Sequence, residues 1–215
     1  MFNSKGALRK DDPRVSDMQR VYATDKHYDD LAHAMKGADV FIGLSSGDIV
    51  TPEMLLGMAD NPIVFAMANP TPEINYNLAI DTRKDIIMAT GRSDHPNQVN
   101  NVLGFPFIFR GALDVRATKI NEEMKKAAVI ALAELAKESV PEQVNIAYGE
   151  TKLTFGRDYI IPKPFDPRLI AAVPPAVAKA AMESGVATAP ITDWEKYKDE
   201  LLERMGSDNK MIRLL

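Results

Sequence analysis

Neutral amide side chains gather in one short stretch near the middle of this 215-residue chain. Four of them fall within the five residues from Asn97 to Asn101, and another, Asn69, follows an apolar run and precedes Pro-Thr-Pro. Amides donate hydrogen bonds to carboxylates, and a helix beginning here adds free N–H groups and its positive dipole end. The pattern favours a site for a small dicarboxylate or a nicotinamide amide. The alternatives are a helix cap at Asn100 or Asn101 and a simple turn at Asn69.

Ionisable residues near this stretch are weaker candidates. His95 is a candidate acid or base, although a loop histidine beside proline is more often solvated. Arg92 and Asp94 are expected to pair with each other. Lys163 and Arg168 flank Pro-Phe-Asp-Pro, where a salt bridge is favoured over a role at a substrate.

Three short apolar runs predict the strands that position these residues. They have the length and flanks of buried strands and cover residues 39–45, 63–69 and 85–91. Helical patterns before and between them cover residues 29–35, 51–59 and 74–80, with Thr51 as a cap. The alternation predicts an α/β fold with a doubly wound parallel sheet covered on both faces. Ligands of such sheets bind beyond the carboxyl ends of the strands, where this sequence becomes small and polar.

The second half of the chain reads as helical. A very apolar segment, 105–113, predicts a buried helix, and 121–137 predicts an amphipathic one. The inward positions of the latter are Met124, Ala127, Ala128, Ile130, Ala131 and Leu135. Residues 141–166 are rich in loops, and a further helix is expected over 167–184. A last helix from Asp193 has its apolar side at Trp194, Tyr197, Leu201 and Leu202. We expect a nucleotide-binding domain over residues 1–150 and an extension with packing helices over 151–215.

Composition excludes several functions. The net charge of -4 argues against a nucleic-acid partner, which needs a basic face. The absence of cysteine excludes disulfides and zinc-thiolate sites, and is compatible with a cytoplasmic protein. No apolar run has the roughly 20 residues that cross a bilayer, and the first residues do not resemble a signal peptide, so no membrane association is expected.

The front of the predicted sheet lacks a glycine-rich phosphate turn. Gly43, Gly47 and Gly57 do not have the Gly-x-Gly-x-x-Gly spacing. We therefore expect the sheet to begin upstream, with residues 1–3 as the end of a truncated second strand. An acid at that position holds the adenosine ribose in dinucleotide folds, whereas Asn3 would not repel a 2′-phosphate.

Several long motifs resemble the bacterial-type malic enzymes and together cover nearly the whole chain. They are Ala38 to Ser45, Ala68-Asn69-Pro70-Thr71-Pro72-Glu73-Ile74, Ala89-Thr90-Gly91-Arg92-Ser93-Asp94, Asn97-Gln98-Val99-Asn100-Asn101, Phe105 to Leu113, and Ile161 to Arg168. The resemblance implies a Rossmann-like fold with added C-terminal helices. It also implies oxidative decarboxylation of malate to pyruvate and CO2 with NADP or NAD and Mg or Mn.

The resemblance assigns roles to individual residues. Malate would be bound by Asn69, Asn100 and Asn101. The cofactor would contact Gly43, Leu44 and Ser45, together with Asn69, Asn101, Asn3 and Ser4. Asn3-Ser4-Lys5-Gly6 resembles the family's Asp-Ser-Lys-Gly segment, and the change from Asp to Asn favours NADP over NAD.

The family's Tyr and Lys acid/base pair and its Glu and Asp metal ligands have no counterpart in this sequence. Tyr22 and Lys26 do not stand in the family's contexts. We therefore expect a carboxy-terminal half with no catalytic and no metal-binding residue, inactive alone and completed by a missing N-terminal half in a homodimer. The alternatives are a non-catalytic nucleotide-binding or interaction module and a malic-enzyme-like half fused to an acyltransferase domain.

Overall fold

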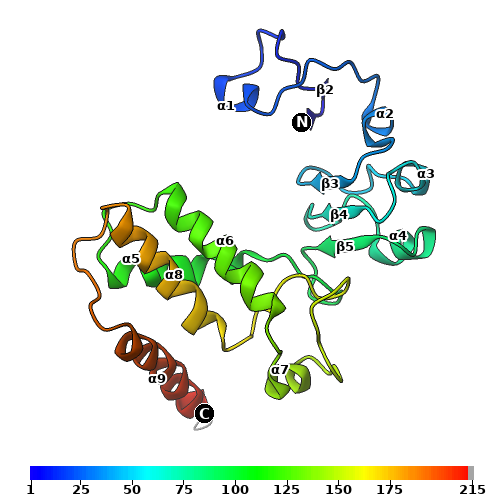
Figure 1. The fold of residues 1–215 in the computed structure, drawn as a ribbon. Helices are drawn as coiled ribbons and strands as arrows, with labels where there is room; N and C mark the ends of the chain where they lie inside the picture. Colours follow the sequence, from blue (N-terminus) through cyan, green and yellow to red (C-terminus); the bar gives the residue numbers. More distant parts are fainter. Residues whose placement is uncertain (213–215) are drawn as a thin grey trace. The chain divides into compact units, whose positions relative to one another are not determined.

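The structure is a computed structural model that describes residues 1–212, with side chains through residue 205. The chain forms two compact units, Met1–Pro96 and Asn97–Leu215 (Figure 1). None of the described helices is long and apolar enough to cross a membrane.

A parallel sheet is the centre of the first unit. Its strands are β3 (Val40–Gly43), β4 (Ile63–Ala66) and β5 (Ile87–Thr90), hydrogen-bonded in that order. The register places Gly43, Ala66 and Thr90 in one row, so all three strands end at the same edge. The predicted strands and their parallel direction are confirmed.

Three short helices pack on one face of this sheet, α2 (Leu31–Met35), α3 (Pro52–Leu56) and α4 (Tyr76–Thr82). Each begins at a side-chain cap, in order Asp30, Thr51 and Asn75. The strand residues in the core that these helices cover are Phe41, Val64, Ala66 and Met88.

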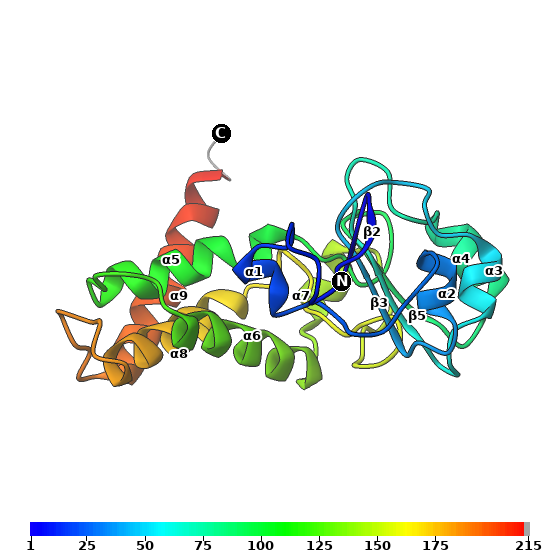
Figure 2. The same cartoon turned by 90° about the horizontal axis from the view of Figure 1, so that it is seen from above.

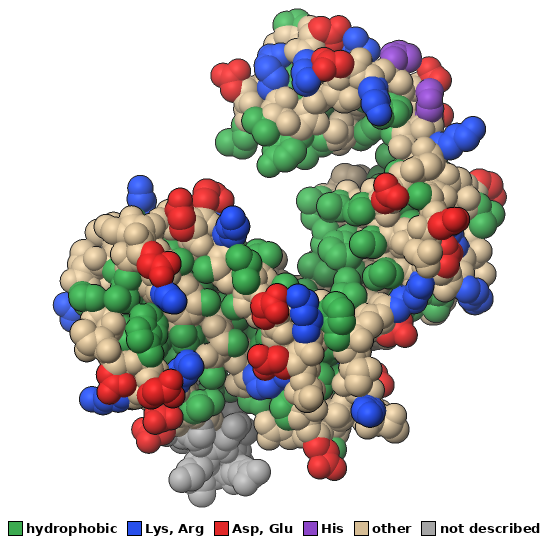
Figure 3. Space-filling model, in the orientation of Figure 1, with side chains coloured by type: hydrophobic (Ala, Val, Ile, Leu, Met, Phe, Trp, Pro, Cys, Tyr) green, Lys and Arg blue, Asp and Glu red, His purple; other side chains and the backbone are tan. Residues whose placement is uncertain are grey.

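The opposite face of the sheet carries exposed apolar side chains. Val40 is 49% and Ile42 61% exposed. In Figure 3, apolar side chains gather over the sheet of the first unit. The sequence predicts helices on both faces, but the helices of the first unit cover only one. The apolar pattern of a strand indicates that its faces tend to be buried, but it does not indicate which element covers them.

The first 20 residues differ from the expectation. β1 (Phe2–Asn3) pairs with β2 (Gly6–Ala7) in an antiparallel hairpin, followed by α1 (Asp17–Arg20). Residues 1–3 are therefore not a strand of the parallel sheet, and that prediction is wrong. The turn explains the hairpin, because Lys5 N–H donates to Asn3 Oδ1 (2.8 Å) and Gly6 has a φ of 110°.

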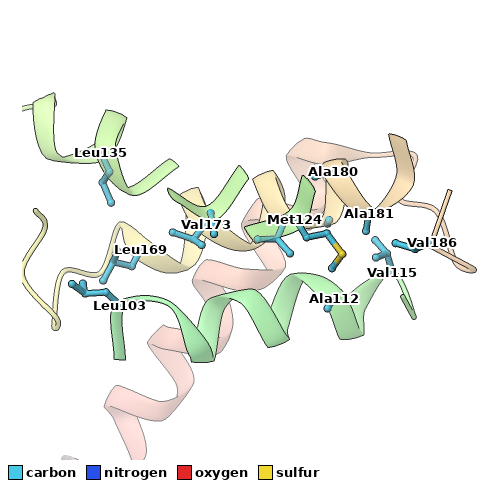
Figure 4. Close-up of a cluster of buried hydrophobic side chains, with 13 residues drawn as sticks. Leu103, Ala112, Val115, Met124, Leu135, Leu169, Val173, Ala180, Ala181 and Val186 are labelled. Carbon is cyan, nitrogen blue, oxygen red and sulfur yellow. The ribbon is translucent and has the colours of Figure 1, made fainter. Parts of the chain in front are cut away.

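A layer of three helices forms the core of the second unit (Figures 2 and 4). The 3-10 turn η1 (Asn101–Leu103) leads into α5 (Phe105–Asp114), and α6 (Glu122–Lys137) and α8 (Leu169–Glu183) complete the layer. Figure 4 shows Met124, Val173 and Leu169 between these helices. A Cβ at Gly111 would lie 2.5 Å from the carbonyl oxygen of Pro174, so α5 and α8 approach more closely than alanine would allow.

Two further helices complete the second unit. α7 (Glu142–Ala147) lies in the stretch that the sequence predicts as loops. α9 (Trp194–Ile212) is joined to α5 by a hydrogen bond that the Tyr197 hydroxyl donates to Asp114 (2.7 Å). Burial and this carboxylate raise the pKa of Tyr197 well above its usual range.

Several residues expected inside are outside. Phe105, Phe109 and Leu113 lie on one side of α5 at 55%, 48% and 65% exposure, so this helix is half-exposed rather than buried. Ile130 on α6 and Leu202 on α9 are also exposed. Apolar residues on most sides of α5 leave its packed side undefined by the sequence, and here α8 selects it.

Candidate functional site

The ends of the parallel strands form the candidate site of the first unit. Leu44, Ser45 and Asn69 lie just beyond β3 and β4 and are exposed. Gly43, the last residue of β3, is buried. The exposed residues at this edge are available to a ligand, as expected for a parallel sheet, whereas Gly43 offers no side chain.

A buried carboxylate joins two of these strand ends. Glu73 is fully buried, and it accepts hydrogen bonds from Ser45 N–H (3.2 Å) and Ala68 N–H (3.0 Å). The local sequence does not distinguish this residue, because a Glu after Pro-Thr-Pro resembles a solvated residue in a turn. The one signal in the sequence that points to Glu73 is its place within a motif that resembles the malic enzymes.

The amide run divides into residues with different roles. Asn97 is buried and structural, since its amide donates to the Arg157 carbonyl (2.8 Å) and accepts from Ile160 N–H (2.9 Å). Asn100 caps η1 by accepting from Val102 N–H (3.0 Å), which confirms that one of the two asparagines is a cap. Asn101 begins η1 and its side chain is exposed.

The site residues predicted for malate therefore come from both units. Asn69 belongs to the first unit, and Asn100 and Asn101 to the second. Within its own unit each is at an element end, either a strand end or the start of a helical turn. Their binding roles stay predictions.

The Arg92 side chain pairs with Asp94, as predicted, with Nη2 and Oδ2 2.8 Å apart. This hydrogen bond lowers the pKa of Asp94 to about 2. His95 stacks on the ring of Tyr76 with centroids 4.3 Å apart. The stacking holds the imidazole in place, so His95 is not a freely solvated loop residue. Its role as an acid or base stays a prediction.

At the second basic pair, one interaction is confirmed. The Arg168 guanidinium donates to both carboxylate oxygens of Asp166, with the shortest bond 2.6 Å from Nη2 to Oδ2, and the Asp166 side chain is 0% exposed. Lys163 is also buried, but its ammonium lies 5.0 Å from the centre of the Tyr148 ring instead of beside a carboxylate. The salt bridge predicted for Lys163 is not found among the described residues.

Asn3 and Ser4 lie in the exposed turn of the β1–β2 hairpin. The Asn3 side chain is the acceptor that closes this turn. A cofactor role for either residue stays a prediction.

The loops at the strand ends suit the close approach of a dinucleotide. A Cβ at Gly47 would lie 2.7 Å from Thr71 Cβ, so the loops after β3 and β4 pack against each other through a position without a side chain. Small exposed residues on such loops let a cofactor approach the backbone. Within residues 1–205, no group of three or more His, Asp or Glu could hold a metal ion.

A parallel sheet with ligand-accessible strand ends is the architecture of the dinucleotide-binding α/β proteins. The family described as "Malic enzyme, NAD binding domain" matches residues 1–150, and the chain belongs to this family.

Curated relatives and a solved structure agree with this assignment. The NADP-dependent malic enzyme of Halomonas elongata is 57% identical over 88% of this chain, and the NAD-dependent malic enzyme of Rhizobium meliloti is 54% identical over 87%. The crystal structure of the Entamoeba histolytica malic enzyme matches the whole chain with a TM-score of 0.85 and 34% identity. The chain spans 45%, 24% and 43% of these proteins, respectively, and so corresponds to a part of each.

Proposed function

We propose that this chain is the cofactor-binding part of a malic enzyme that converts malate and NADP⁺ to pyruvate, CO2 and NADPH. The observation that carries the proposal is the family match over residues 1–150 together with the exposed strand ends of the sheet. Relatives named as NADP-dependent and as NAD-dependent both support a nicotinamide dinucleotide. Asn3 in place of an acid favours NADP. The resemblance alone supports Mg or Mn, a homodimer and a cytoplasmic location.

The proposed role of the asparagines is to bind and orient malate. The amides of Asn69, Asn100 and Asn101 each donate to a malate carboxylate or to the nicotinamide amide. Holding malate and the nicotinamide in a reactive orientation lowers the activation barrier, and the asparagines need to transfer no proton to do so. A bound nicotinamide supplies the hydride acceptor. Amides are neither acids nor bases at neutral pH, so the groups that take the hydroxyl proton and protonate the enol are not these residues. The isolated chain is accordingly expected to be inactive.

A charge placed at the end of β3 tests the cofactor site. In the full-length protein, Ser45→Glu should raise the KM for NADP⁺ about fivefold to tenfold, because an exposed carboxylate repels the cofactor phosphates by about 1 kcal/mol. Steady-state kinetics with malate saturating measures this effect. Asn77→Glu adds the same charge on the exposed side of α4 and should leave the KM unchanged. Equal effects of the two variants would contradict a cofactor site at Ser45.

The turn residue Asn3 offers a test of cofactor preference. Asn3→Asp keeps an oxygen that accepts from Lys5 N–H, so the hairpin should persist. The added carboxylate should repel a 2′-phosphate and accept from a ribose hydroxyl, moving the ratio of kcat/KM for NADP⁺ over NAD⁺ towards NAD⁺. An unaltered ratio would place the specificity elsewhere.

A further inference from the structure

The carboxylate of Glu73 lies beneath the two strand ends that the proposed function uses. It is fully buried, and among the described residues no Lys or Arg forms an ion pair with it. Burying a charge without a cation is unfavourable unless hydrogen bonds replace those of water. The two backbone donors, Ser45 and Ala68, provide this replacement at 3.2 and 3.0 Å.

These two donors lie just past the end of the β3–β4 ladder. The pairing ends at Gly43 and Ala66, followed by one more bond from Met67 N–H to the Gly43 carbonyl (3.1 Å). Beyond this point the segments that follow β3 and β4 are no longer paired as strands. The Glu73 carboxylate accepts one backbone N–H from each of these segments. Glu73 thus acts as a bridge between strand ends that no longer bond to each other directly.

The backbone around Glu73 strengthens this connection. Val50 N–H donates to the Glu73 carbonyl (2.9 Å), and Asp48 N–H donates to the Pro72 carbonyl (3.0 Å). The loop after β3 is therefore attached to residues 72–73 by both main chain and side chain. A shift of the carboxylate would be transmitted to Ser45 on one side and to Ala68, next to Asn69, on the other.

Gly43 provides the space that the carboxylate occupies. A Cβ built on Gly43 would lie 2.3 Å from both Cδ and Oε1 of Glu73. Such a distance is far inside van der Waals contact, so an alanine at this position must displace the Glu73 side chain or the strand end. The glycine at the end of β3 is thereby explained by the buried carboxylate, independently of any cofactor contact.

We propose that Glu73 is a positioning residue of the malic-enzyme site, holding Ser45 for the cofactor and Asn69 for malate by tying the ends of β3 and β4 together. This inference rests on the proposed function. It adds a residue that contacts neither ligand and acts through the backbone of those that do. A carboxylate suits the role because it accepts from both donors, whereas a glutamine would turn its NH2 group towards one of them.

The test uses steady-state kinetics of the full-length protein and its Glu73→Gln variant. We expect kcat/KM to fall by about tenfold or more, mainly through higher KM values for both NADP⁺ and malate, because charge-assisted hydrogen bonds to two strand ends are lost. Asn75→Ala is the matched control, since it removes the cap of the neighbouring helix α4 and should lower thermal stability without changing either KM. Unchanged KM values in Glu73→Gln would overturn the role of Glu73.

Gly43→Ala tests the contact between Glu73 and the end of β3 without altering Glu73 itself. It replaces Glu73→Gln as the test if that variant does not fold. It should raise both KM values in the same way. The double variant Gly43→Ala/Glu73→Gln should be little worse than either single variant, because both act through one carboxylate. Fully additive losses would instead assign the effect of Gly43→Ala to a direct cofactor contact and overturn the connection. Absence of malate-dependent NADP⁺ reduction in the unaltered protein would overturn the proposed function itself, which separates the two failures.

Discussion

Replacing Arg168 with methionine is expected to lower the free energy of unfolding of the second unit by about 3–5 kcal/mol. Asp166 is completely buried and receives the Arg168 guanidinium through Nε and Nη2, and the Arg168 main-chain N–H donates to the same carboxylate (2.9 Å). Arg168 also donates to the carbonyl of Ser139 (2.9 Å). Methionine keeps the apolar stem but leaves a buried carboxylate without its cation. The Arg168 side chain therefore connects the segment before α8 to the residues that follow α6.

Fluorescence of the single tryptophan measures this loss in urea or thermal unfolding. Trp194 packs against the core of the second unit and therefore reports on that unit. Lys137→Met is the matched control, because its ion pair with Glu134 is exposed on both sides and should contribute less than about 1 kcal/mol. The double variant Asp166→Asn/Arg168→Met should recover part of the stability. A loss no larger than that of Lys137→Met would show that the buried pair does not stabilise the unit.

Asn101→Ala is expected to lower kcat/KM for malate in the full-length protein by about tenfold to a hundredfold. Hydrogen bonds to a charged ligand contribute about 1.5–3 kcal/mol, and the exposed Asn101 side chain has no cap to maintain. Its neighbour Asn100 does cap η1, so Asn100→Ala combines a loss of local stability with any effect on malate. Initial rates at varied malate concentration distinguish the two residues.

A structural asparagine in the same unit provides the control for Asn101. Asn121 caps α6 and donates to Ser184 (2.9 Å). Asn121→Ala should cost about 1 kcal/mol of stability and leave malate kinetics unaltered. Unchanged kinetics in Asn101→Ala would remove this residue from the substrate site and leave Asn69 to be tested alone.

The strands of the parallel sheet could be predicted to within two or three residues. Runs such as Ile63 to Ala66 are too short for a buried helix and are bounded by turn residues, so their local pattern has one interpretation. The start of α3 was equally clear, because Thr51 is a strong cap followed by proline. The amphipathic helix α6 was also predicted, and among its named larger side chains only Ile130 was wrongly placed inside. Such a helix has three or four apolar positions in every two turns, and this pattern leaves the edge of the buried stripe undefined.

Three features of the structure could not be predicted in this way. The hairpin of residues 2–7 depends on a local turn that competes with the parallel sheet, and the sequence pattern did not show which would prevail. The exposed side of α5 depends on where α8 lies. α7 is a six-residue helix whose only start signal is Pro141 followed by Glu142, too little to separate it from a loop.

The sequence alone determined the type of fold, the location of the candidate site at the strand ends and the family to which the chain belongs. These follow from local periodicity, from turn residues and from long motifs, all of which are properties of neighbouring residues. Only the tertiary structure decided that the amides of residues 97–101 do not act as one group, with Asn97 buried and Asn100 a cap. It also decided that the carboxylate of Glu73 lies inside the protein, because its hydrogen-bond donors are 28 and 5 residues away and meet it only once β3 and β4 have paired.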